Sequence, residues 1–298
     1  MKLVNYKKKY ESVNKLGLIV NSDVMDLLRL AEHLNTEVPR TIDELVANSQ
    51  VGLKQIRQTM EKADALNVKK EDYYIAQAEL NYLPLIKKPE KILCAGMNYV
   101  NHIIERGGDV PLSPIFFNKL PNALAAHEQE IVLQNNAKKV DYEAELVIVI
   151  GKRINNVGEK EAEEAIFGYT IGNDVSDRGF QFQSSQWLIG KSMDNFAPIG
   201  PALVTKDSID SVQNLSIQTK LNGKLVQDSS TKEMLFNVNK LVSCASQYMT
   251  LMPGDLIFTG TPKGVILEQP EEKQVWLKDK DRVDISIESL GTLSNVFI

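Results

Sequence analysis

The run at residues 141–150, DYEAELVIVI, constrains the fold more than any other stretch of the chain. Its apolar second half predicts a buried β-strand, and its first half carries acids. Because side chains alternate between the two faces of a strand, we expect Glu143 and Glu145 to project from the same face. Their Cα atoms would lie roughly 6.5–7 Å apart, close enough for both carboxylates to bind one cation. A solvated strand edge is the alternative, because a Glu-x-Glu pair is by itself weakly specific.

Composition narrows the class of protein. The chain has 298 residues, 43% of them hydrophobic, which is enough for one large or two ordinary domains. A net charge of -5 without a basic stripe argues against nucleic acid or an anionic membrane as a partner. Cys94 and Cys244 have apolar neighbours, which predicts buried free thiols. No apolar run is long enough to cross a bilayer and the first residues do not resemble a signal peptide, so we expect a cytoplasmic protein.

Two regions of the chain differ in their patterns. Residues 1–88 are predicted to form a small α/β accessory domain, because a strand-like run at 16–20 precedes helical spacing at 23–33 and a capping box at 41–44. A connector with two prolines at residues 82–90 predicts the boundary. From residue 89 to 298, short apolar runs alternate with Gly, Pro and Asn, which favours a β-rich domain and an α+β fold overall. The Asn222-Gly223 pair predicts a tight hairpin.

A histidine and an acid follow the predicted strand at residues 91–96. His102 and Glu105 are three residues apart in a segment that predicts a short helix, so they would share a face. A carboxylate that orients an imidazole can make it a general base near neutral pH. The alternative is an ordinary ion pair on a helix surface.

More polar residues follow the predicted strand at 167–174, which places Asp174 at its C-terminal end. If the next segment is helical, Asp174, Arg178 and Gln181 lie on one side, and the arginine and glutamine could hold the oxygens of an anionic substrate. Lys191 comes shortly afterwards. A Gly-Thr-rich loop within residues 254–264 offers amides and hydroxyls to a carboxylate. It lacks the spacing of a Walker loop, which disfavours nucleotide binding.

Read together, these segments resemble the fumarylacetoacetate hydrolase family from about residue 91 to the C-terminus. The matching motifs are GMNY at 96–99 with His102 and Glu105, DYEAE at 141–145, GYTIGND at 168–174, Gly190-Lys191, PIGP at 198–201 and TLMPGDLIFTGTP at 250–262. Each motif is weak alone, and their order is specific. Residues 1–88 match no catalytic motif and resemble the accessory domain of longer bacterial members.

The resemblance implies a β-rich catalytic domain, a mixed β-sandwich roll, that is usually dimeric. It implies a divalent metal held by Glu143, Glu145 and Asp174, with His102 and Glu105 as an orienting pair. It also implies substrate contacts from Arg178, Gln181, Lys191 and Thr261. Some positions depart from the family pattern: Asp177 precedes Arg178 where the family has alanine, Leu120 replaces a proline, and Ile266 replaces a glycine.

The implied ligand set suggests a chemistry. Carboxylates alone favour a hard cation such as Mg²⁺ or Mn²⁺ over zinc. A 2-oxo acid could fill the open coordination positions, and the metal would stabilise the enolate that forms as a C–C bond breaks. The leading hypothesis is therefore a metal-dependent enzyme that cleaves a C–C bond in a short 2-oxo acid, as an acylpyruvate-type hydrolase or an oxaloacetate decarboxylase. Lys191 and Arg178 would add positive charge at the developing oxyanion, and His102 with Glu105 would activate water for hydrolysis.

Two alternatives remain at this point. One is an isomerase or hydratase of the same family in aromatic-compound catabolism. The other is a non-catalytic binding protein that keeps the pocket, against which the complete set of acids with His102, Glu105 and Lys191 argues.

Overall fold

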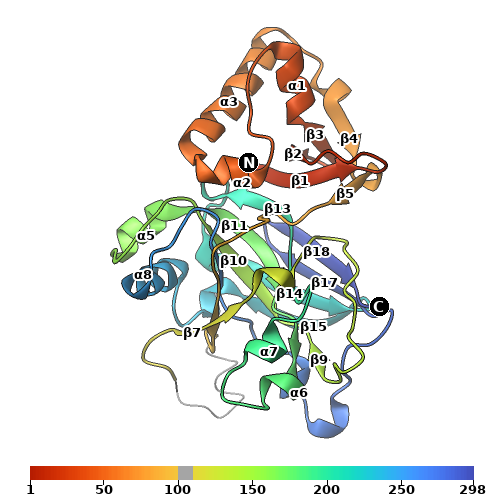
Figure 1. Ribbon diagram of the computed structural model, residues 1–298, viewed down its shortest axis with the longest axis vertical. Coiled ribbons are helices and arrows are strands. Elements are labelled where there is room, and N and C mark those ends of the chain that lie inside the picture. The colour runs from red at the N-terminus through yellow and green to blue at the C-terminus, as the bar shows by residue number, and fades with distance from the viewer. Residues whose placement is uncertain (100–109) are drawn as a thin grey trace.

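A computed structural model describes residues 1–99 and 110–298 of the protein (Figure 1). Among these residues, a 12-stranded sheet dominates, with its strands in the order β4-β3-β2-β1-β13-β11-β10-β16-β6-β7, β5 beside β1 and β8 beside β13. The strands are β1 (Lys2–Lys8), β2 (Lys15–Val20), β3 (Asp23–Asp26), β4 (Tyr74–Ala76), β5 (Leu80–Tyr82), β6 (Ile92–Gly96), β7 (Ile115–Lys119), β8 (Leu124–Ala125), β10 (Ala144–Ile150), β11 (Ile166–Asn173), β13 (Ala197–Thr205) and β16 (Leu256–Phe258).

The N-terminal elements occupy one end of the long axis of the molecule (Figure 1). Three helices accompany strands β1 to β5 there: α1 (Leu27–Leu34), α2 (Ile42–Ala47) and α3 (Ser49–Ala65). Helix α2 begins where expected, because the Thr41 side chain accepts the Glu44 N–H at 3.2 Å. Strand β1 pairs antiparallel with β13, so the main sheet runs through this region into the rest of the chain. The division into domains 1–88 and 89–298 stays a prediction.

Strand β10 lies at the centre of the sheet and is buried along its whole length. Leu146, Ile148 and Ile150 pack into one apolar cluster, while Val147 and Val149 pack into another that includes residues of β1, α1 and α2. Both faces of β10 are therefore covered, and this explains why its sequence is a nearly continuous apolar run. The rigid strand fixes the position of the acids at its start.

A second, four-stranded sheet packs over the first cluster, in the order β15-β14-β17-β18. Its strands are β14 (Ser216–Leu221), β15 (Lys224–Ser230), β17 (Arg282–Ile287) and β18 (Gly291–Val296). The predicted hairpin joins β14 and β15, with φ of 50° at Asn222 and 81° at Gly223. Helices α5 (Glu159–Ala165) and α8 (Val238–Tyr248) lie side by side at the edge of the molecule (Figure 1).

The fold class is confirmed as a β-rich α+β fold. Cys94 and Cys244 are buried free thiols, as predicted. The helix predicted at 23–33 is only partly correct, because residues 23–26 form β3 and the helix begins at Leu27. Pairing of β3 with β2 and β4 outweighs the helical spacing of its residues. In the described part of the chain, no helix has the length and apolarity needed to cross a membrane.

Candidate active site

Three carboxylates meet where β10 begins and β11 ends. The antiparallel register pairs Ala144 with Asn173, which places Glu143 beside Asp174. The Asp174 N–H donates to the Glu143 carbonyl oxygen, and the Glu143 N–H donates to Asn173 Oδ1, at 2.9 Å each. One oxygen from each of Glu143, Glu145 and Asp174 lies within 4.8 Å of the other two. All three side chains are buried, so the alternative of a solvated strand edge is excluded.

Buried cations surround these carboxylates. Lys191 Nζ donates to Glu143 Oε2 and to Asp174 Oδ2, at 2.8 Å each. Lys119 Nζ donates to Asp174 Oδ1 at 2.5 Å, and Arg178 Nη2 lies 2.7 Å from Glu143 Oε1. Burial alone would raise the pKa of Glu143, but Lys191 and Arg178 together lower this pKa below its usual range. Glu143 is therefore a carboxylate held from two sides.

Glu145 differs from its neighbours because no ion pair of the described residues includes it. Its Oε2 accepts the Gly260 N–H at 2.6 Å. Burial, followed by the charges of Asp174 and Glu143, raises the pKa of Glu145 well above its usual range. With Asp141, the buried cluster has four carboxyl groups against three basic side chains, so one carboxyl group has no basic partner among the described residues. A set of oxygen ligands in which one lacks a cation fits a hard divalent cation.

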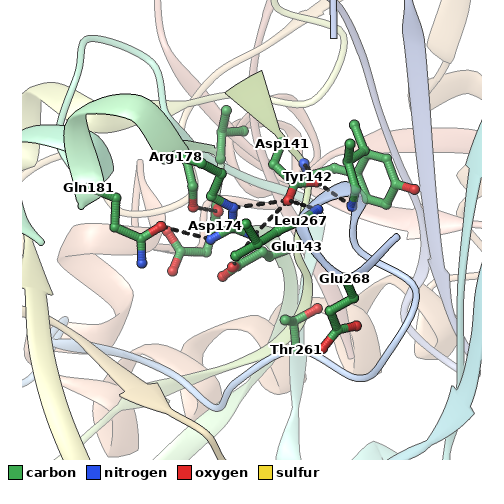
Figure 2. A network of polar contacts seen from close by, with 12 residues as sticks. Asp141, Tyr142, Glu143, Asp174, Arg178, Gln181, Thr261, Leu267 and Glu268 are labelled. Carbon is green, nitrogen blue, oxygen red and sulfur yellow. Dashed lines mark hydrogen bonds and ion pairs between the residues drawn. The ribbon is translucent and has the colours of Figure 1, made fainter. Parts of the chain in front are cut away.

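Arg178 is held almost entirely by the protein (Figure 2). Arg178 has five N–H groups. The N–H on Nε and one of the two on Nη2 donate to Asp141 Oδ2, at 2.9 and 2.8 Å. The other Nη2 donor faces Glu143, and one Nη1 donor goes to Gln181 Oε1 at 2.9 Å. Burial would lower the pKa of Arg178, but the two carboxylates raise it, so the side chain stays a cation. A single Nη1 donor has no partner in the described part of the chain.

A cavity of about 30 Å³ opens beside these groups. It is lined by Ala95, Gly96, Met97, Phe117, Glu143, Glu145, Arg178, Gln181, Trp187, Lys191 and Thr261. Trp187 meets Phe117 edge-on with ring centroids 5.2 Å apart, and Lys191 Nζ lies 5.0 Å from the Phe117 centroid, so part of the wall is aromatic.

The structure brings most of the predicted site residues together. Glu143, Glu145, Arg178, Gln181, Lys191 and Thr261 all line the cavity, and Asp174 adjoins it. Their functional roles stay predictions. His102 and Glu105 lie outside the described residues.

The segment after Asp174 is not helical from its start, so the condition under which Asp174, Arg178 and Gln181 would share one side of a helix is not met. Ser176 and Asp177 form β12 (Ser176–Asp177), which pairs with β9 (Val140–Asp141), and only then does α6 (Arg178–Gln181) begin. Arg178 and Gln181 share that helix, whereas Asp174 precedes it. Asp177 caps α6 by accepting the Phe180 N–H at 2.9 Å. Asp177, which stands where the family has alanine, therefore stabilises the N-terminus of α6.

Sequence reasoning assigned no role to Lys119, Asp141 or Gln227, all of which are buried beside the site. Asp141 is in the same run as the two glutamates, so its position was a usable signal. Lys119 ends β7 after an apolar run, a pattern shared with ordinary surface lysines. Gln227 lies in a polar stretch of β15 and carries no signal in the sequence.

Comparisons with known proteins agree with this geometry. Residues 91–298 match the family model described as fumarylacetoacetate (FAA) hydrolase C-terminal. A mitochondrial oxaloacetate tautomerase of Xenopus laevis is 43% identical over 75% of this chain and 70% of its own length. A mitochondrial oxaloacetate tautomerase of Bos taurus is 36% identical over 99% of this chain and 91% of its own.

A solved structure extends the likeness to the whole fold. The fumarylacetoacetate hydrolase of the psychrophile Exiguobacterium antarcticum superposes with a TM-score of 0.80 at 28% identity, covering 100% of this chain and 99% of that one. The family match covers well over half of this chain, and the buried acids lie inside the matched range. The chain therefore belongs to the fumarylacetoacetate hydrolase family and is an enzyme of that family.

Proposed function

We propose that this chain catalyses an enolate-forming reaction of a short 2-oxo acid, with oxaloacetate as its leading substrate. The observation that carries the proposal is Glu145, a buried carboxylate without a cation partner in the described part of the chain, within 4.8 Å of two other carboxylates. Such a group needs a positive charge beside it to remain ionised. We assign that charge to Mg²⁺ or Mn²⁺ held by Glu143, Glu145 and Asp174.

The residues present fit such an ion, because carboxylate oxygens are the ligands that Mg²⁺ and Mn²⁺ prefer. A bound divalent cation would supply Lewis-acid charge to the oxygens of the substrate. Lys119 and Lys191 hold Asp174 from two sides, at 2.5 and 2.8 Å, so this carboxylate is oriented before any ion binds. Preorganised ligands of this kind favour one geometry over others.

The remaining polar groups around the cavity suit an anionic substrate. Lys191 uses two of its three N–H donors on Glu143 and Asp174, which leaves one. Gln181 accepts from Arg178 through Oε1, so its Nε2 amide, which has no acceptor among the described residues, can donate to a ligand (Figure 2). With the last Nη1 donor of Arg178, these groups form a set of donors beside the acids. A 2-oxo acid, whose carboxylate and keto oxygens are all acceptors, matches that set.

Two candidate reactions pass through an enolate of a 2-oxo acid, formed by loss of a proton in one and by cleavage of a C–C bond in the other. Keto–enol tautomerisation of oxaloacetate moves a proton between C3 and the keto oxygen, and breaks no C–C bond. Relatives named as oxaloacetate tautomerases, at 43% and 36% identity, support this reaction. Cleavage of a C–C bond by hydrolysis or decarboxylation is the second candidate, supported by the likeness to a fumarylacetoacetate hydrolase. An isomerase or hydratase of the same family remains an alternative to both.

A variant of His102 separates hydrolysis from decarboxylation, and a variant of Lys191 tests the positive charge that all the candidate reactions would use. If His102 with Glu105 activates water, His102→Ala should lower acetylpyruvate hydrolysis by about 10²–10⁴-fold. Oxaloacetate decarboxylation needs no water attack and should be less affected. Lys191→Met should impair every activity, because it removes charge at the developing oxyanion. Initial rates are measured for each variant at saturating Mn²⁺. Intact hydrolysis in His102→Ala would remove the pair from the proposed mechanism.

Metal binding is tested separately by calorimetric titration of Mn²⁺. Wild type should bind one ion, and Glu145→Gln should bind it at least about tenfold more weakly. Glu159→Gln is the matched control, because Glu159 lies on α5 with an exposed side chain. Equal affinity in wild type and Glu145→Gln would contradict the assigned ligands.

We also propose a cytoplasmic homodimer, following the sequence-based expectations. Light scattering should give about twice the chain mass of 33.4 kDa. The relatives named above are mitochondrial proteins by name, so cell fractionation is the measurement that decides the location.

A further inference from the structure

Thr261 lines the cavity and is buried, and its hydroxyl can in principle donate or accept a hydrogen bond. Which of the two it does toward a ligand depends on its other partners. Within the described part of the chain, Gln227 Nε2 is its nearest one, at 3.0 Å from Thr261 Oγ1. The direction of that hydrogen bond decides what Thr261 offers to the cavity.

The orientation of the Gln227 amide is fixed by groups that cannot reverse their role. Its Oε1 accepts the backbone N–H of Ala144 at 3.2 Å, and a backbone N–H is only a donor. Its Nε2 donates to the carbonyl oxygen of Pro262 at 2.9 Å, and a carbonyl oxygen is only an acceptor. Thr219 Oγ1 donates to the same Oε1 at 2.7 Å. If the amide were flipped, Nε2 would face the Ala144 N–H and Oε1 would face the Pro262 carbonyl oxygen. Two donors would then oppose each other at one contact and two acceptors at the other.

Gln227 Nε2 can only donate, and after Pro262 its nearest acceptor is Thr261 Oγ1 at 3.0 Å, closer than the Lys263 carbonyl oxygen at 3.4 Å. This hydrogen bond occupies a lone pair of the Thr261 hydroxyl oxygen. The hydroxyl proton of Thr261 has one acceptor among the described residues, Pro262 O at 3.5 Å, the outer limit of a hydrogen bond. That carbonyl already accepts from Gln227 at 2.9 Å. The proton is consequently available to an acceptor in the cavity.

We propose that Gln227 is a positioning residue that makes Thr261 a hydrogen-bond donor to the substrate carboxylate. Gln227 is 1% exposed and does not line the cavity, so it acts only through Thr261 and the loop that carries it. Its contact with Ala144, between the two glutamates, ties the same amide to the start of β10. One side chain thus fixes the Thr261 loop relative to the proposed metal ligands. This inference rests on the proposed function, because it presumes an anionic ligand.

The arrangement at Gln181 follows the same logic and supports this assignment. There Arg178 donates to Gln181 Oε1 at 2.9 Å, which turns the Nε2 amide into the group that remains for a ligand. Thr261 and Gln181 can each donate or accept a hydrogen bond. In both cases a buried neighbour, Gln227 or Arg178, donates to the side-chain oxygen and leaves an O–H or N–H group for the ligand. Donors at these two positions favour a ligand that places acceptor oxygens there.

The test is the affinity of Mn²⁺-loaded protein for oxalate, an anion whose oxygens are all acceptors, measured by calorimetry. Gln227→Glu keeps acceptors for Ala144 and Thr219 but removes the amide donor, so Thr261 can turn its proton away from the cavity. We expect Gln227→Glu and Thr261→Val each to weaken oxalate binding by about tenfold or more. Thr261→Ser should retain most of the affinity. Mn²⁺ affinity should stay unchanged in all three variants.

Combining the two changes distinguishes positioning from general damage. In a Thr261→Val background, Gln227→Glu should have little further effect, because the hydroxyl it controls is already gone. Gln227→Met serves as a second variant should Gln227→Glu fail to fold. Gln213→Glu is the matched control: Gln213 also accepts a backbone N–H, from Val238 at 2.9 Å, but lies away from the cavity. It should leave oxalate affinity unchanged.

Unchanged oxalate affinity in Gln227→Glu would overturn the assignment, and so would an equal loss with and without the Thr261 hydroxyl. Either result would leave the proposed function standing. Failure of Mn²⁺-loaded wild type to bind oxalate would instead contradict the proposed function and the assignment together.

Discussion

Arg178 directs both Nε and Nη2 at a single oxygen of Asp141, Oδ2, at 2.9 and 2.8 Å (Figure 2). The same carboxylate accepts the backbone N–H groups of Ile266 and Leu267, at 2.9 and 3.1 Å. Asp141 is fully buried, so these hydrogen bonds are shielded from water. Asp141 therefore joins the proposed substrate arginine to the segment that follows the Gly-Thr-rich loop.

Asp141→Asn should destabilise the protein by about 3 kcal/mol or more, because it leaves a buried guanidinium with a weaker partner. The measurement is urea unfolding followed by fluorescence. Asp72→Asn is the control, since its ion pair with Lys69 is exposed and should contribute less than about 1 kcal/mol. Equal urea midpoints for Asp141→Asn and Asp72→Asn would show that the buried Asp141 carboxylate contributes no more to stability than the exposed one of Asp72.

Gly190 packs against the backbone of α6 from α7 (Leu188–Lys191), and these two helices carry Gln181 and Lys191. A Cβ atom at Gly190 would lie 2.4 Å from the Gln181 backbone nitrogen and 2.6 Å from the Asp177 carbonyl oxygen. Gly190→Ala should therefore force the helices apart and lower the melting temperature by several degrees, with loss of activity. Gly158→Ala is the control, because its Cβ would meet nothing within 4 Å. A Gly190→Ala protein with wild-type stability would contradict this packing.

His127 predicts a pH dependence of stability. Its Nδ1 accepts the Ser294 N–H at 3.1 Å, which requires an unprotonated nitrogen, and its ring meets Tyr82 edge-on. Burial, with help from Arg282 and against Asp284, lowers the pKa of His127 to about 4. The unfolded chain protonates near its usual pKa of about 6.5. Below that pH the unfolded state binds more protons, so stability falls as pH decreases from about 6.5 to about 4.

The loss attributable to His127 should be about 2–3 kcal/mol. Unfolding free energies of wild type and His127→Gln are compared at pH 7.5 and at pH 4.5, because other acids also titrate there. The difference in unfolding free energy between wild type and His127→Gln should be smaller at pH 4.5 than at pH 7.5. The same difference at both pH values would mean that His127 is protonated equally in the folded and unfolded states.

The sequence indicated which residues lie close together better than it indicated the contacts that support them. Glu143, Glu145, Arg178, Gln181, Lys191 and Thr261 meet at one cavity, as the ordered motifs implied. β10 was recognisable because a strand covered on both faces has a continuous apolar run. The hairpin at Asn222-Gly223 was equally clear, since its turn needs positive φ.

The remaining features depend on long-range contacts that no local pattern encodes. Strand β3 forms because β2 and β4 pair with it, against the helical spacing of its residues. Lys119 and Gln227 are polar residues whose burial is decided by partners 55 and 34 positions away. A lysine or glutamine of this kind has the same local sequence whether it is buried or exposed. Their importance could be recognised only from the folded chain.

The central claim, a divalent-metal site that promotes enolate formation in a 2-oxo acid, has one direct test. Chelator-treated protein is supplied with Mn²⁺ or Mg²⁺, and the enol-to-keto conversion of oxaloacetate is followed by its ultraviolet absorbance above the spontaneous rate. Wild type should accelerate the conversion only after metal is restored, and Glu145→Gln should remain at least about 100-fold slower at the same metal concentration. Equal acceleration by wild type and Glu145→Gln, or by wild type with and without metal, would contradict the account.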